Sequence, residues 1–537
     1  MSVITQFGGI APRVADHLLP PNAAHIAHNV KLRNGKLESW RERENLAYGV
    51  VDAVSLVVKG CCFLTWDACV SVADFLPDYG RMFITGRAAQ PEVFTLDNCQ
   101  PSYLFLGVPP PAAAPTISAA ETDGRDCSAR SYIYTYVNVF GEESAPSPPS
   151  RQVTVKDGTG VSITNLLAPP AGYGITQIRL YRTATAFRDG SEKEQQPLTG
   201  YLLVNTLSGT VGSTVDNKLE KFLGAANNTR EVRVPPKHLR QIRHVNETSV
   251  LTGVTNNEVH FSEPYQPYNW PAAYDMTLPY HIVNMVTVDQ YVIISTDGYP
   301  FVIDGGPSCE PRQCRATSQV DIPLPDIGCG YPNSAIATPF GMVYSSKDGL
   351  VLVSPDAKFQ IITANWFSTD DWVELRPETV RLGYWRGYLI CVTDIVSFML
   401  EVDGQTYNDF ALGALTTISD KPVDMFLTDI GELMMLEDRF ISQWNTGQYL
   451  RPYLWESREL DFGGESSPNT VKIRTTDTLF RITAPTGSYY ERKVINEKPV
   501  RLGRIGRHLN YRIQLSGTGT VDYVALGTMK TTVNAGR

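Results

Sequence analysis

Helical periodicity is nearly absent from this chain of 537 residues. Apolar residues at helical spacing are hard to sustain over about eleven residues anywhere in the sequence. Short runs rich in Val, Ile, Tyr, Phe and Thr, bounded by Gly, Pro, Asn or Asp, occur throughout. With 42 Gly and 36 Pro to form turns, the sequence predicts an all-β protein, with short helices only near residues 21–30 and 371–374.

Composition indicates a chain with large apolar cores. Aromatic residues make up 10% and charged residues only 19% of the sequence, whereas disordered chains are poor in aromatics and rich in charge. The length suggests about three or four domains. The first residues lack a basic start followed by an apolar run, so we expect no secretory signal. No uncharged apolar run approaches the roughly 18 to 20 residues that span a bilayer, so we expect no membrane insertion.

A strand, a polar turn and a second strand recur between residues 250 and 436. Their turn residues lie 41, 51, 46 and 35 residues apart, close to the roughly 40 to 50 residues of a four-stranded propeller blade. This spacing favours a β-propeller, and unrelated stacked sandwiches are the alternative. Residues 60–96 hold four more strand-like runs, which we expect to form a further blade. The five turn residues are Asn256, Asp297, Asp348, Asp394 and Asp429.

Residues 109–220 form a separate segment with its own linker and turn residues. The proline-rich segment 109–115 is a stiff extended linker that marks a boundary. About seven short strands follow in roughly 105 residues, a density typical of an immunoglobulin-like or fibronectin-III-like sandwich. The runs YTYVNVFGEESAPSPPS and IRLYRT resemble the fibronectin-III-like modules of phage structural proteins. We therefore expect a sandwich inserted between propeller blades.

No motif in the sequence indicates catalysis. There is no Gly-rich phosphate loop, no His-Glu-x-x-His pair and no Gly-x-Ser-x-Gly elbow, so we expect neither an enzyme nor a bound cofactor. Asp297, Asp348 and Asp394 could supply a glycosidase acid and base, but Asp is favoured in hairpin turns for its local backbone bonds. The best metal candidates are too few and too widely spaced for a structural zinc site, namely Cys309, Cys314 and Cys329.

Charge is distributed unevenly along the chain. Residues 471–537 contain twelve Lys or Arg and four Asp or Glu, a net charge of +8. Because the whole chain carries −9, the first 470 residues carry −17. Such asymmetry suggests an acidic body and a basic end that contacts an acidic partner surface or nucleic acid; a solvated sheet face is the alternative. The candidate contact residues are Arg501, Arg504, Arg507 and Arg512.

The N-terminal segment has the most distinctive pattern. Gly8, Gly9 and Pro12 keep its start extended, and Asn34-Gly35 predicts a tight hairpin turn. An extended arm with few apolar anchors gains little by folding alone, so we expect it to lie across a neighbouring domain or subunit. Deletion of residues 1–40 would then leave subunits that fold but assemble poorly.

These residues carry a resemblance to a known family. The pattern Gly-Gly-Ile-x-Pro, Leu-Leu-Pro, Ala-Ala, Ala-x-Asn, a hairpin glycine and a Trp resembles the N-terminus of phage tail nozzle proteins, the tail tubular protein B family of short-tailed phages. The segments 383–392 and 453–463 are similar to strands of the same proteins. The matching N-terminal residues include the candidate interface residues Gly8, Gly9, Pro12, Leu19, Asn29, Gly35 and Trp40, together with Pro20, Ala24 and Ala27.

The resemblance implies a structural virion protein of the phage tail. Six copies would form a ring-shaped nozzle, assembled in the host cytoplasm, that joins an adaptor below the portal to fibre, spike or needle proteins. Viral double-stranded DNA would pass transiently through it. The expected domains are an N-terminal arm and hairpin (1–50), a first blade region (51–108), the inserted sandwich (109–220), further blades (221–460) and a basic β segment that closes the propeller or contacts neighbours (461–537).

Two other classes of function remain open. A receptor-binding or glycan-cleaving propeller of a phage tail would have a pocket with two carboxylates about 5 to 10 Å apart. A bacterial surface adhesin built on the sandwich is disfavoured because we expect no export signal.

Overall fold

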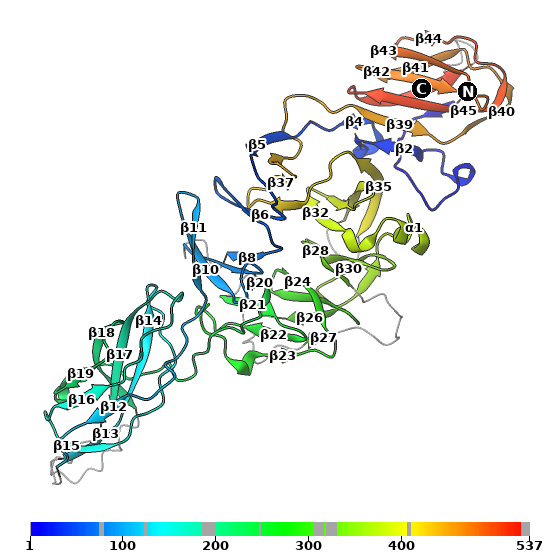
Figure 1. Ribbon diagram of the computed structural model, residues 1–537. Helices are drawn as coiled ribbons and strands as arrows, with labels where there is room; N and C mark the ends of the chain where they lie inside the picture. Colours follow the sequence, from blue (N-terminus) through cyan, green and yellow to red (C-terminus); the bar gives the residue numbers. More distant parts are fainter. Residues whose placement is uncertain are drawn as a thin grey trace. The chain divides into compact units, whose positions relative to one another are not determined.

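The structure, a computed structural model, is nearly all-β (Figure 1). The expected helix at 371–374 is confirmed as α1 (Thr369–Glu374), where Ser368 Oγ accepts a hydrogen bond from the Asp371 amide. No helix among the described residues is long and apolar enough to cross a membrane. The chain divides into two compact units, one with the described parts of 1–69, 280–304 and 315–537 and one with those of 70–279. The structure describes residues 2–74, 80–122, 127–184, 200–245, 249–304, 316–317, 330–404 and 410–527.

Unit 1 contains a series of antiparallel strand groups, namely three four-stranded sheets, the first four strands of a ten-stranded sheet and a two-stranded hairpin. The first strand of each sheet packs against the first strand of the next: β24 on β28, β28 on β32, β32 on β36, and β36 on the hairpin strand β6. Their strands are β24 (Ile282–Val288), β25 (Tyr291–Thr296), β26 (Phe301–Asp304) and β27 (Ala316–Thr317); β28 (Gly330–Thr338), β29 (Gly341–Ser346), β30 (Gly349–Val353) and β31 (Phe359–Ile361); β32 (Arg381–Trp385), β33 (Tyr388–Val392), β34 (Ser397–Asp403) and β35 (Ala411–Ile418); β36 (Asp424–Leu427), β37 (Leu433–Leu436), β38 (Phe440–Gln443) and β5 (Glu44–Tyr48); and the hairpin β6 (Ser55–Lys59) and β7 (Cys62–Trp66).

Successive sheets enclose separate apolar cores. Every residue of β30 is buried, and successive side chains of a strand point to opposite faces. Val351 and Val353 therefore join the core shared with β24–β26, whereas Leu350 and Leu352 join the core shared with β33 and β34. This two-sided burial explains the near-continuous apolar runs of the sequence.

The five repeated hairpins are confirmed. Four of the marker residues lie between the second and third strands of their sheets, whereas Asp429 lies between the first and second strands, β36 and β37. The equivalent second turn of that sheet contains Asp438, nine residues further along. The last interval is short because Asp429 lies in the first hairpin of its sheet, whereas the other four markers lie in the second.

Asp424 joins β36 to β6. Its carboxylate accepts hydrogen bonds from the Leu56 amide at 2.7 Å and the Met425 amide at 2.9 Å. Burial raises the pKa of Asp424 to about 6, and these hydrogen bonds and Arg381 only partly offset that effect.

This raised pKa predicts a pH dependence of stability. The unfolded carboxyl titrates near 3.8, so the unfolded chain loses its proton at lower pH than the folded chain. The contribution of Asp424 to the free energy of unfolding should therefore fall by roughly 3 kcal/mol between about pH 4 and pH 6. Urea denaturation of wild type and Asp424→Asn across that range should give curves that diverge by this amount, and parallel curves would contradict the prediction.

The C-terminal strands extend the sheet of β32–β35 and form one further sheet around a large core of unit 1. Trp455, Phe480 and Leu515 are fully buried within it. One sheet continues from β35 through the N-terminal strand β2 (Ala24–His28), and the other has the order β1-β46-β41-β44. The strands are β39 (Tyr453–Ser457), β45 (His508–Gly517), β42 (Thr478–Thr483), β43 (Tyr489–Val494) and β40 (Leu460–Ser466), and β1 (Ser2–Ile4), β46 (Val521–Gly527), β41 (Thr470–Thr475) and β44 (Val500–Arg501).

The structure does not confirm a free N-terminal arm. β1 pairs with β46, β2 lies between β39 and β35, and β5 completes the sheet of β36–β38. The helix expected near 21–30 is wrong, because that region forms β2. The expected hairpin is present between β3 (Val30–Lys31) and β4 (Glu38–Ser39), but six residues, 32–37, connect the last pair instead of the expected two-residue turn at Asn34-Gly35. Both turn residues have positive φ, 68° and 72°, a conformation that Asn and Gly tolerate best.

Unit 2 contains two four-stranded sheets and a group of shorter ones. The four-stranded sheets share a core that includes Phe83 and Ile242. Only three of the four runs expected in one blade at 60–96 belong to the same sheet, because the first run, CCFLTW, contains β7 and pairs with β6. The strands are β8 (Ser71–Asp74), β9 (Met82–Thr85), β10 (Glu92–Asp97) and β11 (Gln100–Phe105), and β20 (Arg240–Val245), β21 (Val250–Val254), β22 (Glu258–Phe261) and β23 (Met276–Thr277).

The shorter sheets of unit 2 share one core, which includes Tyr132, Tyr134 and Tyr136. These tyrosines lie on β14, every residue of which is buried. The strands are β12 (Thr116–Ser118), β16 (Val161–Thr164) and β19 (Thr214–Asp216); β13 (Cys127–Arg130) and β15 (Val153–Lys156); and β14 (Tyr132–Asn138), β17 (Ile175–Thr183) and β18 (Tyr201–Ser208).

The proline-rich run after β14 pairs with that strand by an unusual pattern. Ser144, Ser147 and Ser150 donate their amides to the carbonyls of Tyr136, Tyr134 and Tyr132. Each serine hydroxyl accepts the amide of the same tyrosine, at 2.9 to 3.1 Å. Proline has no amide to donate, so serine at every third position supplies the bonds along this edge of the core.

A buried ion pair links β17 to β19. Arg182 Nη1 lies 2.6 Å from Asp216 Oδ2, and the two side chains are 1% and 0% exposed. Tyr132 donates its hydroxyl to the same carboxylate at 2.9 Å.

Asp216→Ala should strongly destabilise this core, because it leaves the buried Arg182 guanidinium with only the more distant Asp157 carboxylate, at 3.9 Å. We expect a loss of about 3 to 5 kcal/mol in the free energy of unfolding, measured by urea denaturation with hydrogen exchange on peptides from 127–184. The matched control is Glu121→Ala, since the Glu121–Arg151 pair is more than half exposed and should contribute at most about 1 kcal/mol. Equal losses in the two variants would contradict the prediction.

Candidate functional site

Three of the candidate N-terminal interface residues are buried against their own chain. Leu19, Asn29 and Trp40 are only 5%, 6% and 3% exposed. Asn29, at positive φ, donates to Ser419 Oγ at 2.6 Å and accepts from the Ser419 amide at 3.0 Å. Trp40 packs against Tyr388 with ring centroids 5.1 Å apart. In the structure these side chains stabilise unit 1.

The glycines of the same pattern allow close backbone contacts. A Cβ at Gly9 would lie 2.3 Å from the Leu415 carbonyl oxygen, and one at Gly8 would lie 2.8 Å from the Asn22 carbonyl oxygen. Gly35 accepts a hydrogen bond from the Phe7 amide at 3.0 Å. Pro12 lines a small apolar pocket of about 240 Å³ beside α1. The pattern therefore positions the N-terminal segment along β35.

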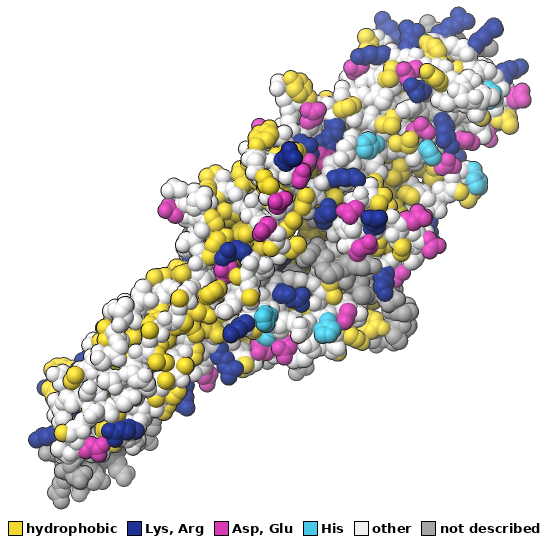
Figure 2. Space-filling model, viewed as in Figure 1, with side chains coloured by type: hydrophobic (Ala, Val, Ile, Leu, Met, Phe, Trp, Pro, Cys, Tyr) yellow, Lys and Arg dark blue, Asp and Glu magenta, His cyan; other side chains and the backbone are white. Residues whose placement is uncertain are grey.

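The basic candidates differ in their surroundings. Arg501, Arg504 and Arg507 are exposed, and within the described residues we find no acidic partner within 4 Å of their guanidinium groups. Arg512 instead lies 2.8 Å from Asp16 and within 4 Å of two glutamates. Figure 2 shows Lys and Arg side chains gathered over the C-terminal strands. Three of the four arginines are thus available to a partner.

A cleft brings together residues from three distant parts of unit 1. It has a volume of about 540 Å³ and lies between residues 6–11, the turn at 32–35 and strands β34 and β35. Glu401 and Asp403 of β34 line it, as do Arg33 and Trp366. Arg33 Nε is 3.6 Å from Glu401 Oε1. Burial, and then the charge of Asp403, raises the pKa of Glu401.

Sequence patterns gave no indication of this cleft. Gly8, Gly9 and Gly35, which we singled out as interface residues, line it, but the pattern offered no reason to connect them with β34. In the sequence, Glu401 and Asp403 are simply polar residues that alternate with apolar ones along a strand. Charged residues at the end of a strand are a weak signal unless the facing segment is known.

Sequence patterns also did not indicate a further group of polar residues, which lies in unit 2. His260 is almost fully buried, with Nδ1 2.7 Å from Asp275 Oδ1 and Nε2 2.9 Å from Thr255 Oγ1. A carboxylate, an imidazole and a hydroxyl hydrogen-bonded in this order is the arrangement that activates a nucleophile in many enzymes. Here the three residues join the β21–β22 hairpin to the segment before β23, and we interpret the group as structural.

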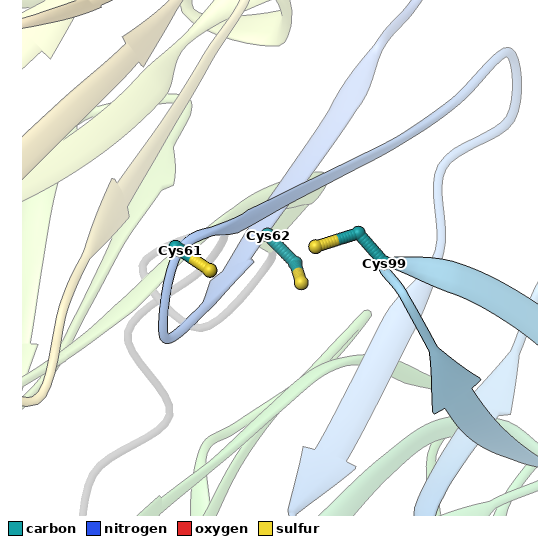
Figure 3. A group of neighbouring side chains, drawn as sticks. All are labelled: Cys61, Cys62 and Cys99. Atoms are coloured by element: carbon teal, nitrogen blue, oxygen red, sulfur yellow. The ribbon is translucent and has the colours of Figure 1, made fainter.

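The remaining candidates do not form a site in the described residues. Asp297 lies in the β25–β26 turn, and its carboxylate accepts a hydrogen bond at 2.9 Å from the amide of His281, which precedes β24. Asp348 and Asp394 also lie in hairpin turns. The possible zinc ligands Cys309, Cys314 and Cys329 lie outside the described residues. Figure 3 shows Cys61 and Cys62 at the β6–β7 turn and Cys99 at the β10–β11 turn.

Comparisons with known proteins do not place the chain in a family. No family model matches it, and no curated protein matches it. One similar solved structure is the extracellular domain of a putative one component system from B. thetaiotaomicron, at 9% identity and a TM-score of 0.31, covering 86% of this chain. This chain spans 47% of that protein's length. Others are Hsv2 of Kluyvelomyces marxianus, at 10% identity, 63% and 86% coverage of the two chains and a TM-score of 0.25, and Sqt1 of Saccharomyces cerevisiae, at 9% identity, 76% and 98% coverage and a TM-score of 0.25.

Proposed function

We propose that this chain is a structural virion protein that forms the ring-shaped tail nozzle of a short-tailed phage. The nozzle is a conduit for genome ejection that joins the portal adaptor to the distal tail parts. The observation that carries the proposal is the exposed group of Arg501, Arg504 and Arg507, which have no acidic partner in the described part of their own chain. Three exposed cations on an otherwise acidic chain are suited to an acidic surface on a neighbouring subunit.

The proposed architecture is a β-propeller with an inserted immunoglobulin-like sandwich. The serial packing of first strands in unit 1, with an apolar core between successive sheets, supports blades that cover one another's faces. The strands from β12 to β19 around a common core support the inserted sandwich. Rigid modules of this kind suit a conduit wall, because such a wall needs a fixed shape and stable contacts between subunits.

The acidic remainder of the chain is compatible with passage of DNA. The first 470 residues carry a net charge of −17, and a strongly basic lumen would hold the phosphate backbone and slow ejection. Head-to-tail contacts between identical chains close into rings when the rotation permits. Each such interface should bury more than about 1,000 Å².

Native mass spectrometry and negative-stain electron microscopy of the purified full chain test this proposal. We expect closed rings of six copies with a central opening. A chain that remains monomeric at high micromolar concentration and low salt would contradict ring formation.

A further inference from the structure

The cleft at β34 and β35 has the size and rigidity of a small-ligand pocket. Its volume of about 540 Å³ lies within the roughly 300 to 1,000 Å³ of typical ligand sites. Backbone hydrogen bonds hold its walls in place, from the Gly8 amide to Asn22 at 2.6 Å and from the Ile10 amide to Leu415 at 2.9 Å. A ligand would therefore enter a preformed pocket, with little loss of chain entropy.

The cleft brings hydrogen-bond acceptors and donors close together. Glu401 and Asp403 are two residues apart on β34, so they share one face of the sheet with Cα atoms about 7 Å apart. Beside them, Arg33 Nε lies 3.6 Å from Glu401 Oε1, and Arg33 Nη1 donates to the Arg386 carbonyl at 3.4 Å. The Arg33 side chain is 45% exposed, so its remaining guanidinium N–H groups can reach a ligand. Side-chain amides of Asn22 and Asn34 add further donors and acceptors.

Trp366 adds an aromatic surface to this polar lining. Its side chain is half-buried and lines the cleft, where an indole face can pack against C–H groups. The two carboxylates disfavour phosphate and other anions. Hydroxyl groups, which both donate and accept, match the mixed lining better than a simple cation does.

We propose that this cleft binds a saccharide, with a sugar ring packed near Trp366 and its hydroxyls bonded to Glu401, Asp403 and Arg33. A neutral pyranose combines an apolar C–H face with hydroxyls around its edge, which is the combination that these walls recognise. The proposal goes beyond the nozzle function, because a conduit for DNA needs no such pocket. It gives unit 1 a role in contact with surface glycans.

The test uses the purified full chain on a printed array of bacterial surface oligosaccharides. We expect retention of at least one neutral oligosaccharide, followed by a saturation-transfer NMR signal and a measurable Kd by calorimetry. Glu401→Gln and Asp403→Asn should each weaken the Kd at least about tenfold, since each loses hydrogen bonds to a charged group. Both changes preserve side-chain size, so folding should be retained, and circular dichroism checks it.

The matched control is Asp429→Asn, which removes an exposed carboxylate from the β36–β37 turn outside the cleft. Its affinity for the oligosaccharide should equal that of wild type. Three outcomes would overturn the proposal: no retention of any oligosaccharide at millimolar concentration, retention that Glu401→Gln and Asp403→Asn leave unchanged, or binding of lysine-rich peptides alone.

Discussion

Deletion of residues 1–40 is expected to unfold the C-terminal sheets of unit 1. The deletion removes β2 from between β39 and β35 and takes away the buried side chains of Phe7, Leu37 and Trp40. Burial of each large apolar side chain contributes about 1.5 to 3 kcal/mol, and the segment supplies several of them. The sum is comparable to the roughly 5 to 15 kcal/mol that stabilises a typical domain.

Circular dichroism and thermal unfolding of the truncated chain measure this effect. A matched control is deletion of residues 1–4, which removes the edge strand β1 and a single buried side chain of the core, Ile4, and should leave a folded chain with a modestly lower Tm. If the N-terminal segment were a free arm, the longer deletion would instead leave a folded chain that assembles poorly. If the chain without residues 1–40 unfolds cooperatively at the wild-type temperature, the structural role of the segment is wrong.

Reversal of charge at Arg501, Arg504 and Arg507 has the second large expected effect. The triple Glu variant should fold normally, because the three side chains are exposed and without acidic partners among the described residues. It should nevertheless shift the proposed ring to monomers at micromolar concentration, since like charges across an interface cost several kcal/mol. Sedimentation velocity measures the shift. Wild-type rings should also weaken as salt rises.

The matched control reverses three exposed cations of unit 2, Lys156, Arg230 and Lys237. It changes the net charge of the chain by the same amount, so a general charge effect would appear in both variants. Rings that persist in the Arg501, Arg504 and Arg507 variant would refute the basic contact between subunits, and with it the observation that carries the nozzle proposal.

Local patterns predicted the strands and turns well. Hairpins at Asn256, Asp297, Asp348 and Asp394 follow from alternating apolar residues beside a turn former, and both signals lie within a few residues of each other. The short α1 was also predictable, since the Ser368 and Asp371 capping pair is local. The marker Asp429 was less informative, because any hairpin of a sheet can carry the same turn residue.

Partners far apart in the sequence could not be predicted. Ala24 pairs with Ser457, and nothing in the residues around Ala24 specifies that strand. The segment consequently resembled a free arm, although its small residues serve close packing within unit 1. The cleft could not be predicted for the same reason, because Arg33, Trp366 and Glu401 line one cleft only when β35 lies beside the N-terminal segment.

Cryo-electron microscopy of the intact phage particle would locate this chain in the tail. We expect density for six copies in a closed ring around the tail axis, below the portal adaptor, with Arg501, Arg504 and Arg507 at a contact between neighbouring subunits. A particle in which this chain lies away from that axis, or a tail that lacks it, would contradict the nozzle proposal.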